Sequence, residues 1–280
     1  MTVDFSSETS TPPIEVLLEA SRLPKVAAGM RRAHEALAAL RFHEGLRRRW
    51  AEARAESALR EATGVALSEG IRITVGDLRA YSLSEEDTDP QDPGTALARG
   101  IWRAQWNLAS TFPPLNAPTP HVERPRPLPA LLAGIHRDIC SGLVAAGHLN
   151  TSTVAVPTSP EAVSSLATLL AAQLPVPICA AEIVARFHTS TLFVPASGAV
   201  GWALARHVLV TRGVDPSGVA VVSASSARDP YSMAAGLDAW RSRTVNGVGQ
   251  WLLHYADSLV EGAHEGEDVA LRIQAGRIGD

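Results

Sequence analysis

The amino-acid sequence predicts an all-α protein. Apolar residues make up 46% of its 280 residues but aromatic residues only 5%, and alanine is plentiful. This composition favours helices that pack through small side chains over a β-sandwich. In several long segments, apolar positions recur three and four residues apart, which is the period of an amphipathic helix. Segments that could form strands are short: residues 154–157 are one, and residues 219–224 are either a strand or a buried connection.

The chain is expected to begin with a disordered lead, residues 1–13, which has neither the basic start nor the apolar run of a signal peptide. Residues 14–94 are expected to form an N-terminal helical arm, because apolar side chains follow one helical stripe within residues 14–62. That stripe includes Val26, Met30, Ala33, Leu37 and Leu40.

Gly70 is expected to end the long helical run, because glycine is the residue most often found just past a helix C-terminus. A short extended step follows. Thr74, with Asp77 three residues later, approximates a capping box and predicts the start of another helix. Residues 82–94 combine acidic residues with proline and glycine and are expected to be a loop.

A helical core is expected over residues 95–264 and a loose tail over 265–280. The clearest helix of the core follows Ser197, and Gly213 with the later Pro216 is expected to end it. The other helices expected in the core are 95–108, 129–147, two within 160–190 separated by LPVP, 230–242 and 248–262.

Charge and cysteine content narrow the classes of partner and compartment. The net charge of −4 gives no basic surface for nucleic acid, and the run Arg47–Arg49 lies in an acid-interleaved helix. Cys140 and Cys179 are too few for a disulfide framework and are expected to be buried thiols. No apolar run reaches the roughly 20 residues of a membrane span. A cytoplasmic protein without nucleic-acid or membrane partners is expected.

Residues 191–224 allow two interpretations. In the first, TLFVPA is a strand, SGAVGWALA a glycine-rich turn that opens a helix, and VAVVSA the next strand of a dinucleotide-binding unit. Gly198 and Gly201 would let the backbone approach a pyrophosphate at the helix N-terminus. However, Ala196 stands where the first glycine of that motif is expected, and no acidic residue follows the second strand. An NAD(P)-dependent oxidoreductase is therefore one alternative.

The second interpretation rests on TLFVPASGA (191–199) and the helix VGWALARHVLVTRGVDP after it. The pair resembles the HPFxxGNGR motif of the Fic/DOC (Fido) family of nucleotidyl transferases and the helix that follows that motif. Phe193 matches the motif phenylalanine, Gly198 its second glycine and Gly213 the glycine that ends the helix. Segments resembling the family's other helices, and its flap at VAVPTSPEAV, stand in the expected order over about residues 55–262. The resemblance implies an all-α Fido-like helical bundle with a small β-hairpin flap.

The resemblance also implies which chemistry is missing. Thr191 stands in place of the family's catalytic histidine, and a threonine hydroxyl does not accept a proton near neutral pH. Pro195 replaces the acidic ligand of magnesium. The motif's phosphate-binding side chains are replaced at Ser197 and Ala199, and a further arginine at Trp202. What remains for binding an anion is the backbone near Gly198.

Four further residues belong to this comparison. His188 is a candidate substitute base, although a partly buried histidine with local hydrogen bonds is the favoured interpretation. VALSEGIRIT resembles the family's inhibitory segment, which makes Glu69 and Gly70 the inhibitory positions. Glu69 is then a candidate partner for Arg206, itself a candidate cofactor-binding residue. The alternative is an exposed glutamate and an arginine that runs along the bundle. No two histidines stand four residues apart, so no metal site is expected.

The leading hypothesis is a degenerate, catalytically inactive Fido protein that binds or regulates another protein through its flap or core groove, without a cofactor. An active AMP transferase with non-standard residues is the second hypothesis; it would need ATP and magnesium. A second copy of the chain is also a candidate partner.

Overall fold

The computed structural model describes residues 11–83, 92–116 and 126–277, and within these ranges the regular elements are all helices. The all-α prediction is confirmed. The helices are α1 (Ile14–Ser21), α2 (Pro24–Arg41), α3 (Leu46–Ser68), α4 (Val75–Leu83), α5 (Pro93–Ser110), α6 (Leu128–Ala145), α7 (Pro160–Ala171), α8 (Val176–Thr189), α9 (Ser197–Thr211), α10 (Ser223–Arg228), α11 (Pro230–Arg241) and α12 (Val245–Gln274), with a 3-10 turn η1 at Thr151–Thr153.

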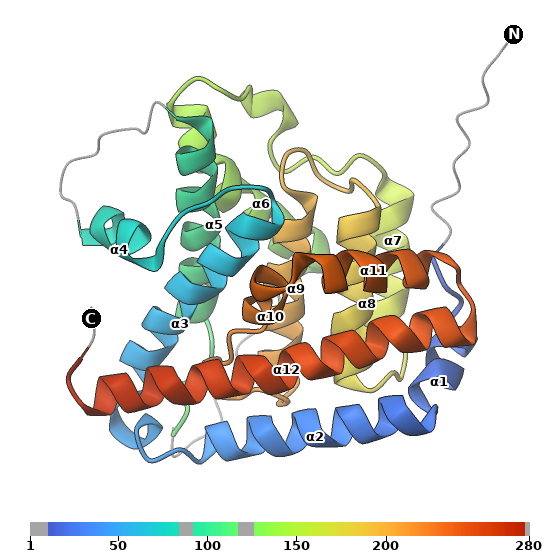
Figure 1. Cartoon of the computed structure of the whole chain (residues 1–280). Helices are drawn as coiled ribbons and strands as arrows, with labels where there is room; N and C mark the ends of the chain where they lie inside the picture. Colours follow the sequence, from blue (N-terminus) through green and yellow to red (C-terminus); the bar gives the residue numbers. More distant parts are fainter. Residues whose placement is uncertain (1–10, 84–91, 117–125, 278–280) are drawn as a thin grey trace, which may run out of the picture.

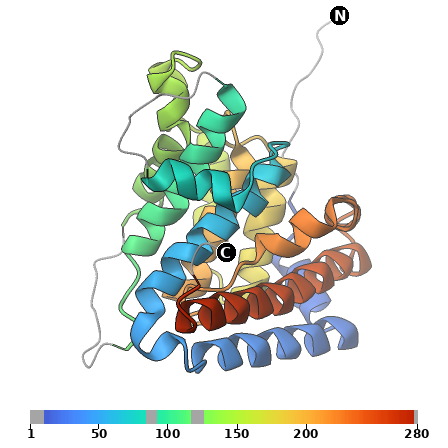
Figure 2. The same cartoon turned by 60° about the vertical axis from the view of Figure 1, so that its left-hand side comes forward.

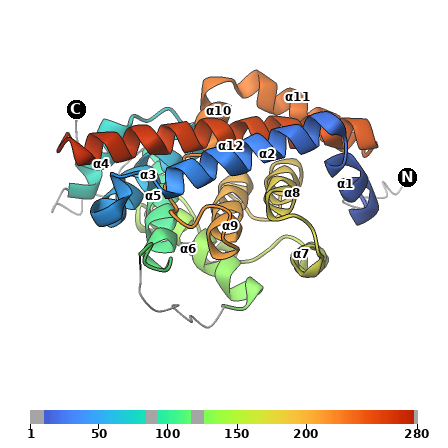
Figure 3. The ribbon, with the colours of Figure 1, turned by 90° about the horizontal axis from the view of Figure 1, so that it is seen from below.

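The helices form two layers (Figures 1 and 3). α2 and the long α12 lie side by side along most of their length, and α11 packs on α12. Behind them, α8 pairs with α9, α5 pairs with α6, and α3 runs between α5 and the α12 layer (Figure 2). Fully buried aromatic side chains gather where α8, α9 and α12 meet: Phe187, Trp202, Trp251 and Tyr255. The indole N–H of Trp251 donates to the Ala181 carbonyl (2.9 Å) and ties α12 to α8.

The helical stripe predicted over residues 14–62 of the arm divides into α1, α2 and part of α3. Pro24 occupies the first position of α2, where its missing N–H costs no helical hydrogen bond. Residues 42–45 separate α2 from α3. Residues 1–10 of the expected lead and 84–91 of the expected acidic loop lie outside the described residues.

Gly70 ends α3, as the sequence predicts. Its φ is +81°, the Gly70 N–H donates to the Leu67 carbonyl (3.0 Å), and the Ile71 N–H donates to the Ala66 carbonyl (2.9 Å). This paired pattern closes a helix through a left-handed residue. The predicted capping box of α4 also forms: the Thr74 N–H donates to Asp77 (3.2 Å), and the Asp77 N–H donates to the Thr74 hydroxyl (3.1 Å).

The predicted β-hairpin flap is wrong for the described residues, because no strand forms at 154–157. Ala155 has a φ of +63°, which turns the chain, and Pro157 and Pro160 have no N–H to offer to a strand ladder. The segment still passes beside the predicted site. The Thr158 N–H donates to the Leu192 carbonyl (2.9 Å), and its hydroxyl to the Thr191 carbonyl (2.6 Å).

The loose tail predicted from residue 265 is wrong up to Gln274, because α12 continues to that residue. Arg49 and Arg60 of α3 hold this stretch, through the Ile273 carbonyl and through Glu265 and Asp268. Residues 219–222 form a buried connection, not a strand, and lie against α12. The Val221 N–H donates to the Gly262 carbonyl (2.9 Å), and a Cβ on Gly262 would stand 2.8 Å from the Val221 carbonyl oxygen. Glycine allows this close approach. Beyond it, Val269, Ala270 and Ile273 continue the buried stripe.

One described helix, α6, is long and apolar enough to cross a membrane by length and composition alone, and 39% of that stretch is buried. It packs against α5 and α9, with Leu132, Ile135 and Ile139 in the core. Such a composition is equally typical of a core helix.

Candidate functional site

A pocket of about 240 Å³ lies where the end of α3 meets the loop between α8 and α9, residues 190–196. It brings together most of the positions singled out in the sequence. Its lining residues include Glu69, His188, Thr191, Phe193, Pro195, Ser197 and Gly198. Residues more than 100 positions apart therefore meet at one site.

The α8–α9 loop has no strand, so the segment is a helix, a loop and a helix. Ser197 fixes its shape from inside. Its hydroxyl lies 2.8 Å from the Phe187 carbonyl and 3.1 Å from the Ser190 carbonyl, and it accepts the Leu192 N–H (3.2 Å). The dinucleotide-binding interpretation needs strands at 191–196 and 219–224, and neither forms. That interpretation loses its structural basis.

Phe193 and Pro195 hold the loop against the bundle, while the Thr191 side chain faces solvent. Phe193 is buried and its ring lies 4.9 Å from that of His136 on α6. The Pro195 carbonyl lies 3.1 Å from Nε2 of the same histidine. Thr191 is exposed, and within the described residues no hydrogen bond joins its hydroxyl to a base that would activate it.

The first turn of α9 receives a carboxylate from α3. The Ala199 N–H donates to Oε1 of Glu69 (2.8 Å). Gly198 makes the approach feasible, because a Cβ there would stand 2.7 Å from that oxygen and 2.4 Å from Cε1 of His188. Burial raises the pKa of Glu69, and the Ala199 hydrogen bond partly offsets this shift. The N-terminus of α9, the natural place for a bound anion, thus holds the chain's own acidic side chain.

His188 stands beside this carboxylate at the end of α8. Burial lowers its pKa to about 4, so it is neutral at physiological pH. Its Nε2 is buried and has no hydrogen-bond partner within the described part of the chain. Its ring meets that of Trp202 edge-on, with 6.2 Å between centroids. The simple interpretation of His188 as a locally hydrogen-bonded residue is therefore wrong for Nε2.

The predicted pairing of Glu69 with Arg206 is wrong. Arg206 stands eight residues after Gly198, which is about 12 Å along the helix, too far from a side chain that caps the first turn. It is buried in the core and donates to Gln105 Oε1 (2.9 Å) and the Gly218 carbonyl (2.8 Å). Burial lowers the pKa of Arg206, and the nearby charges of Glu61 and Asp215 partly offset this shift. Arg206 therefore does not line the pocket and is not placed to bind a cofactor there.

Trp202, at the place of the second family arginine, is also a core residue. It is 2% exposed and stacks on Tyr255, with centroids 6.3 Å apart. Its indole N–H has no partner among the described residues. Because the indole fills the space below the pocket, no cationic side chain reaches the N-terminus of α9 from this position.

His136 is a site residue that the sequence analysis missed. Its Nδ1 accepts the Ala155 N–H (2.9 Å), so Nε2 carries the proton that points toward the Pro195 carbonyl. One neutral histidine thereby joins residues 154–158 to the α8–α9 loop, and burial lowers its pKa. Cys140 lies 3.2 Å from Nε2, but burial raises the pKa of this thiol to about 12. An apolar helix with a single inward histidine was the only sequence signal.

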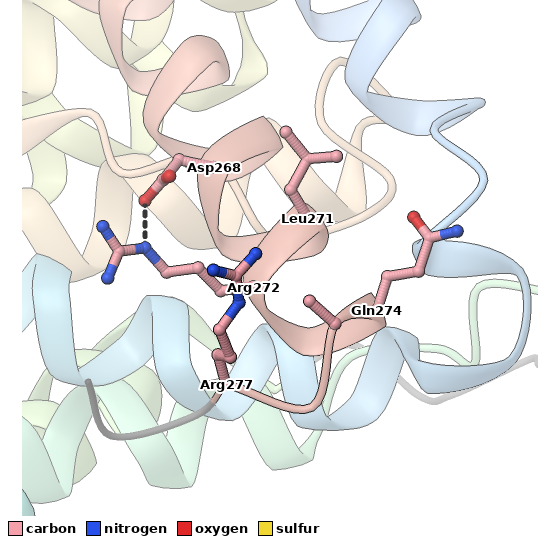
Figure 4. A pocket seen from close by; sticks show the side chains of 6 residues that line it. Asp268, Leu271, Arg272, Gln274 and Arg277 are labelled. Carbon is pink, nitrogen blue, oxygen red and sulfur yellow. Dashed lines mark hydrogen bonds and ion pairs between the residues drawn. The ribbon is translucent and has the colours of Figure 1, made fainter.

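The other chemistry-bearing groups do not extend the site. No group of three or more His, Cys, Asp or Glu that could hold a metal occurs among the described residues. A pocket of about 590 Å³ lies at the end of α12, where most lining side chains are exposed (Figure 4). There, Arg272 Nε donates to Asp268 (2.8 Å), an exposed i,i+4 pair of the kind that stabilises a helix end only slightly.

The chain was compared with known proteins. No protein-family model matches it, and no curated protein is significantly similar to it.

Proposed function

We propose that the chain is a degenerate Fido-type protein that does not transfer nucleotides and instead binds or regulates another protein. The observation that carries this proposal is the Glu69 carboxylate at the N-terminus of α9. A nucleotide phosphate would need those backbone N–H groups, and a carboxylate held there repels a second anion. The fold supports the proposal only at the level of an all-α bundle with a helix–loop–helix at 188–206.

The side chains around the pocket also argue against transfer chemistry of the family's kind. The position of the family's base holds an exposed threonine, Thr191, and that of its metal ligand holds Pro195. The threonine hydroxyl is too weak a base to take up a proton near neutral pH, and proline has no side-chain oxygen that could bind a metal. Ser197 has the only hydroxyl on the first turn of α9, and it is engaged by the loop backbone.

The surface beside the pocket supports a protein partner. Val156 and Val194 are about half exposed, at 54% and 50%, on two segments that Thr158 joins by hydrogen bonds. A partner surface that covers both segments would bury these two apolar side chains. Such a partner requires neither ATP nor magnesium.

The test is incubation of the full chain with radiolabelled ATP and Mg²⁺ or Mn²⁺, alone and with cell extract. No transfer of label is expected. The Glu69→Ala variant, which frees the Ala199 N–H, is expected to remain inactive because position 191 still lacks a base. Labelling by either protein would overturn the proposal.

The protein partner is tested by cross-linking the chain in cell extract. Val194→Asp should abolish cross-linking to the partner, whereas Tyr231→Asp, at an exposed site on α11, should not.

A second candidate is an enzyme of the same family with altered chemistry, favoured by the unpaired Nε2 of His188 next to the pocket. A neutral imidazole with a free nitrogen can act as a general base when a substrate comes within hydrogen-bond reach. If the wild-type chain labels a target, His188→Ala should abolish that labelling. Unchanged labelling in this variant would reject His188 as the base.

A further inference from the structure

A second pocket, of about 560 Å³, lies between α3 and α5 and under the turn that follows α5. These two helices run side by side (Figures 1 and 2). The residues that give the pocket its chemistry are Trp50, Ala51, Arg54, Trp106, Phe112 and Pro114. Arg54 and Glu69 are about 22 Å apart along α3. The pocket is therefore separate from the site described above.

The walls of this pocket are aromatic and its floor is made of small residues. Trp106 is 43% exposed and Trp50 is partly exposed, although tryptophan buries more apolar surface than any other side chain when it is covered. Ala55 and Ala109 are among the lining residues and form the floor, while the exposed Ala51 stands on the rim. The volume falls within the range of about 300–1,000 Å³ that small-molecule sites occupy. A flat ring system fits such walls best, because it can stack on both indoles.

The charge of the pocket comes from Arg54, the one ionisable side chain among its lining residues. Arg54 is 4% exposed, and its guanidinium donates to the backbone carbonyls of Ser217 (3.0 Å), Phe112 (3.3 Å) and Pro113 (3.2 Å). It forms no ion pair with a carboxylate among the described residues. Burial, together with the charge of Arg206, lowers its pKa to about 10, so it is still a cation at neutral pH.

This cation also decides which ligand charge is compatible. The guanidinium carbon of Arg54 lies 4.7 Å from the Trp50 ring centroid and 5.7 Å from that of Phe112. The Trp50 and Phe112 rings each already have this cation at one face, and a second cation would be repelled by it. An anion is attracted by the positive charge of Arg54, which Asp215 stabilises from the core without forming an ion pair.

We propose that the pocket between α3 and α5 binds a planar aromatic molecule that carries a carboxylate or sulfonate group. Its ring system stacks on Trp50 and Trp106, and its anionic group is oriented by the positive charge of Arg54. This site does not depend on the function proposed for the Glu69 pocket.

The first test uses anilinonaphthalene sulfonate, a fluorescent aromatic anion, with the full chain. Saturable binding to one site is expected, and Trp106→Ala should weaken it about tenfold through the lost stacking. Tyr231→Ala removes an exposed aromatic ring on α11 and should leave the affinity unchanged. Near-ultraviolet circular dichroism of each protein verifies that the dye binds a folded chain. Absence of saturable binding, or equal affinity in Trp106→Ala, would overturn the proposal.

The second test separates charge from shape. Ala51 is exposed on the rim, so Ala51→Glu and Ala51→Gln place side chains of equal size there and differ only in charge. The Ala51→Glu variant should bind the sulfonate dye about fivefold more weakly than the Ala51→Gln variant, because the added negative charge opposes the field of Arg54. The neutral analogue N-phenyl-1-naphthylamine should bind both variants equally. A dye affinity that is the same in the two variants would overturn the preference for an anion.

Discussion

The Glu69 carboxylate accepts the Ala199 N–H across 2.8 Å, although the two residues are 130 positions apart in the chain. This contact joins the last turn of α3 to the first turn of α9. It satisfies one of the N–H groups that an α-helix leaves without a partner at its start, and it places a negative charge at the positive end of the helix dipole. The same contact lies at the pocket that brings together the positions singled out in the sequence.

Replacing Glu69 should separate the hydrogen bond from the charge. Glu69→Ala leaves the Ala199 N–H without its acceptor, and the free energy of unfolding should fall by about 1 kcal/mol. Glu69→Gln keeps an oxygen acceptor and removes a buried charge, so the loss should be smaller. Urea unfolding at pH 7 measures both. Equal losses for the two variants would show that the carboxylate charge, and not the acceptor, stabilises the first turn of α9.

Gly198 should not tolerate a side chain. The added Cβ of Gly198→Ala would stand 2.4 Å from Cε1 of His188 and 2.7 Å from Glu69 Oε1, so one of these groups must move. We expect a loss of about 1–3 kcal/mol in the free energy of unfolding.

Gly134 on α6 gives the matched control for that substitution. It is also a helical glycine, but a Cβ there meets no atom within 4 Å. Gly134→Ala should therefore stabilise the protein by about 0.5–1 kcal/mol, as expected for glycine replaced by alanine within a helix. Thermal unfolding of both variants gives the comparison. If Gly198→Ala were also stabilising, the close approach of Glu69 and His188 to α9 would be contradicted.

Local signals in the sequence were enough to predict much of the fold. Helix period, the stop at Gly70 and the capping pair Thr74 and Asp77 depend only on near neighbours, and each was predicted correctly. The length of α12 was not. For residues 219–224 the sequence left a strand and a buried connection open, and the structure shows the buried connection at 219–222. The valines can be buried without a sheet only because Gly262 lets their backbone lie against α12.

The candidate site shows the same division. The sequence indicated that Glu69 and the 191–199 loop belong together, and the structure brings them into contact. The predicted partner of Glu69, Arg206, was wrong, because Arg206 lies deeper along α9 and donates to Gln105. His136 could not be found, since its two hydrogen bonds reach residues 19 and 59 positions away. Contacts of this kind require the packing of α6 against the loop.

His188 should make the stability of the protein depend on pH. Burial lowers its folded pKa to about 4, against an ordinary value of 6.5. The unfolded chain then binds a proton that the folded chain excludes, so stability falls as the pH decreases from about 6.5 toward 4. Between pH 7 and pH 5 this residue should cost about 2 kcal/mol. Urea unfolding of the wild type and of His188→Gln at both values measures the difference.

The pH effect can be assigned to His188 because its neighbour acts in the opposite direction. Burial raises the pKa of Glu69, so the folded chain holds that proton more tightly, and this contribution to stability is lost as the pH rises through the folded pKa. The loss on acidification should therefore be smaller in His188→Gln than in the wild type, and larger in Glu69→Gln. An unchanged pH profile in His188→Gln would contradict the low pKa. Titration of the His188 Cε1–H signal by NMR gives an independent value.

Replacing His136 should weaken the attachment of residues 154–158 to the α8–α9 loop and destabilise the protein. His136→Phe keeps a ring of similar size against Phe193 but leaves the Ala155 N–H and the Pro195 carbonyl without their partner. Two unsatisfied polar groups in a largely buried setting should cost about 2–4 kcal/mol. Thr158→Val is the matched control, because it removes only the exposed hydroxyl bond to Thr191 and should cost less than about 1 kcal/mol.

Hydrogen exchange then locates the effect of the His136 substitution: the Ala155 amide should lose protection in His136→Phe and keep it in Thr158→Val. If the Ala155 amide stayed protected in His136→Phe, the imidazole would not be its acceptor in solution.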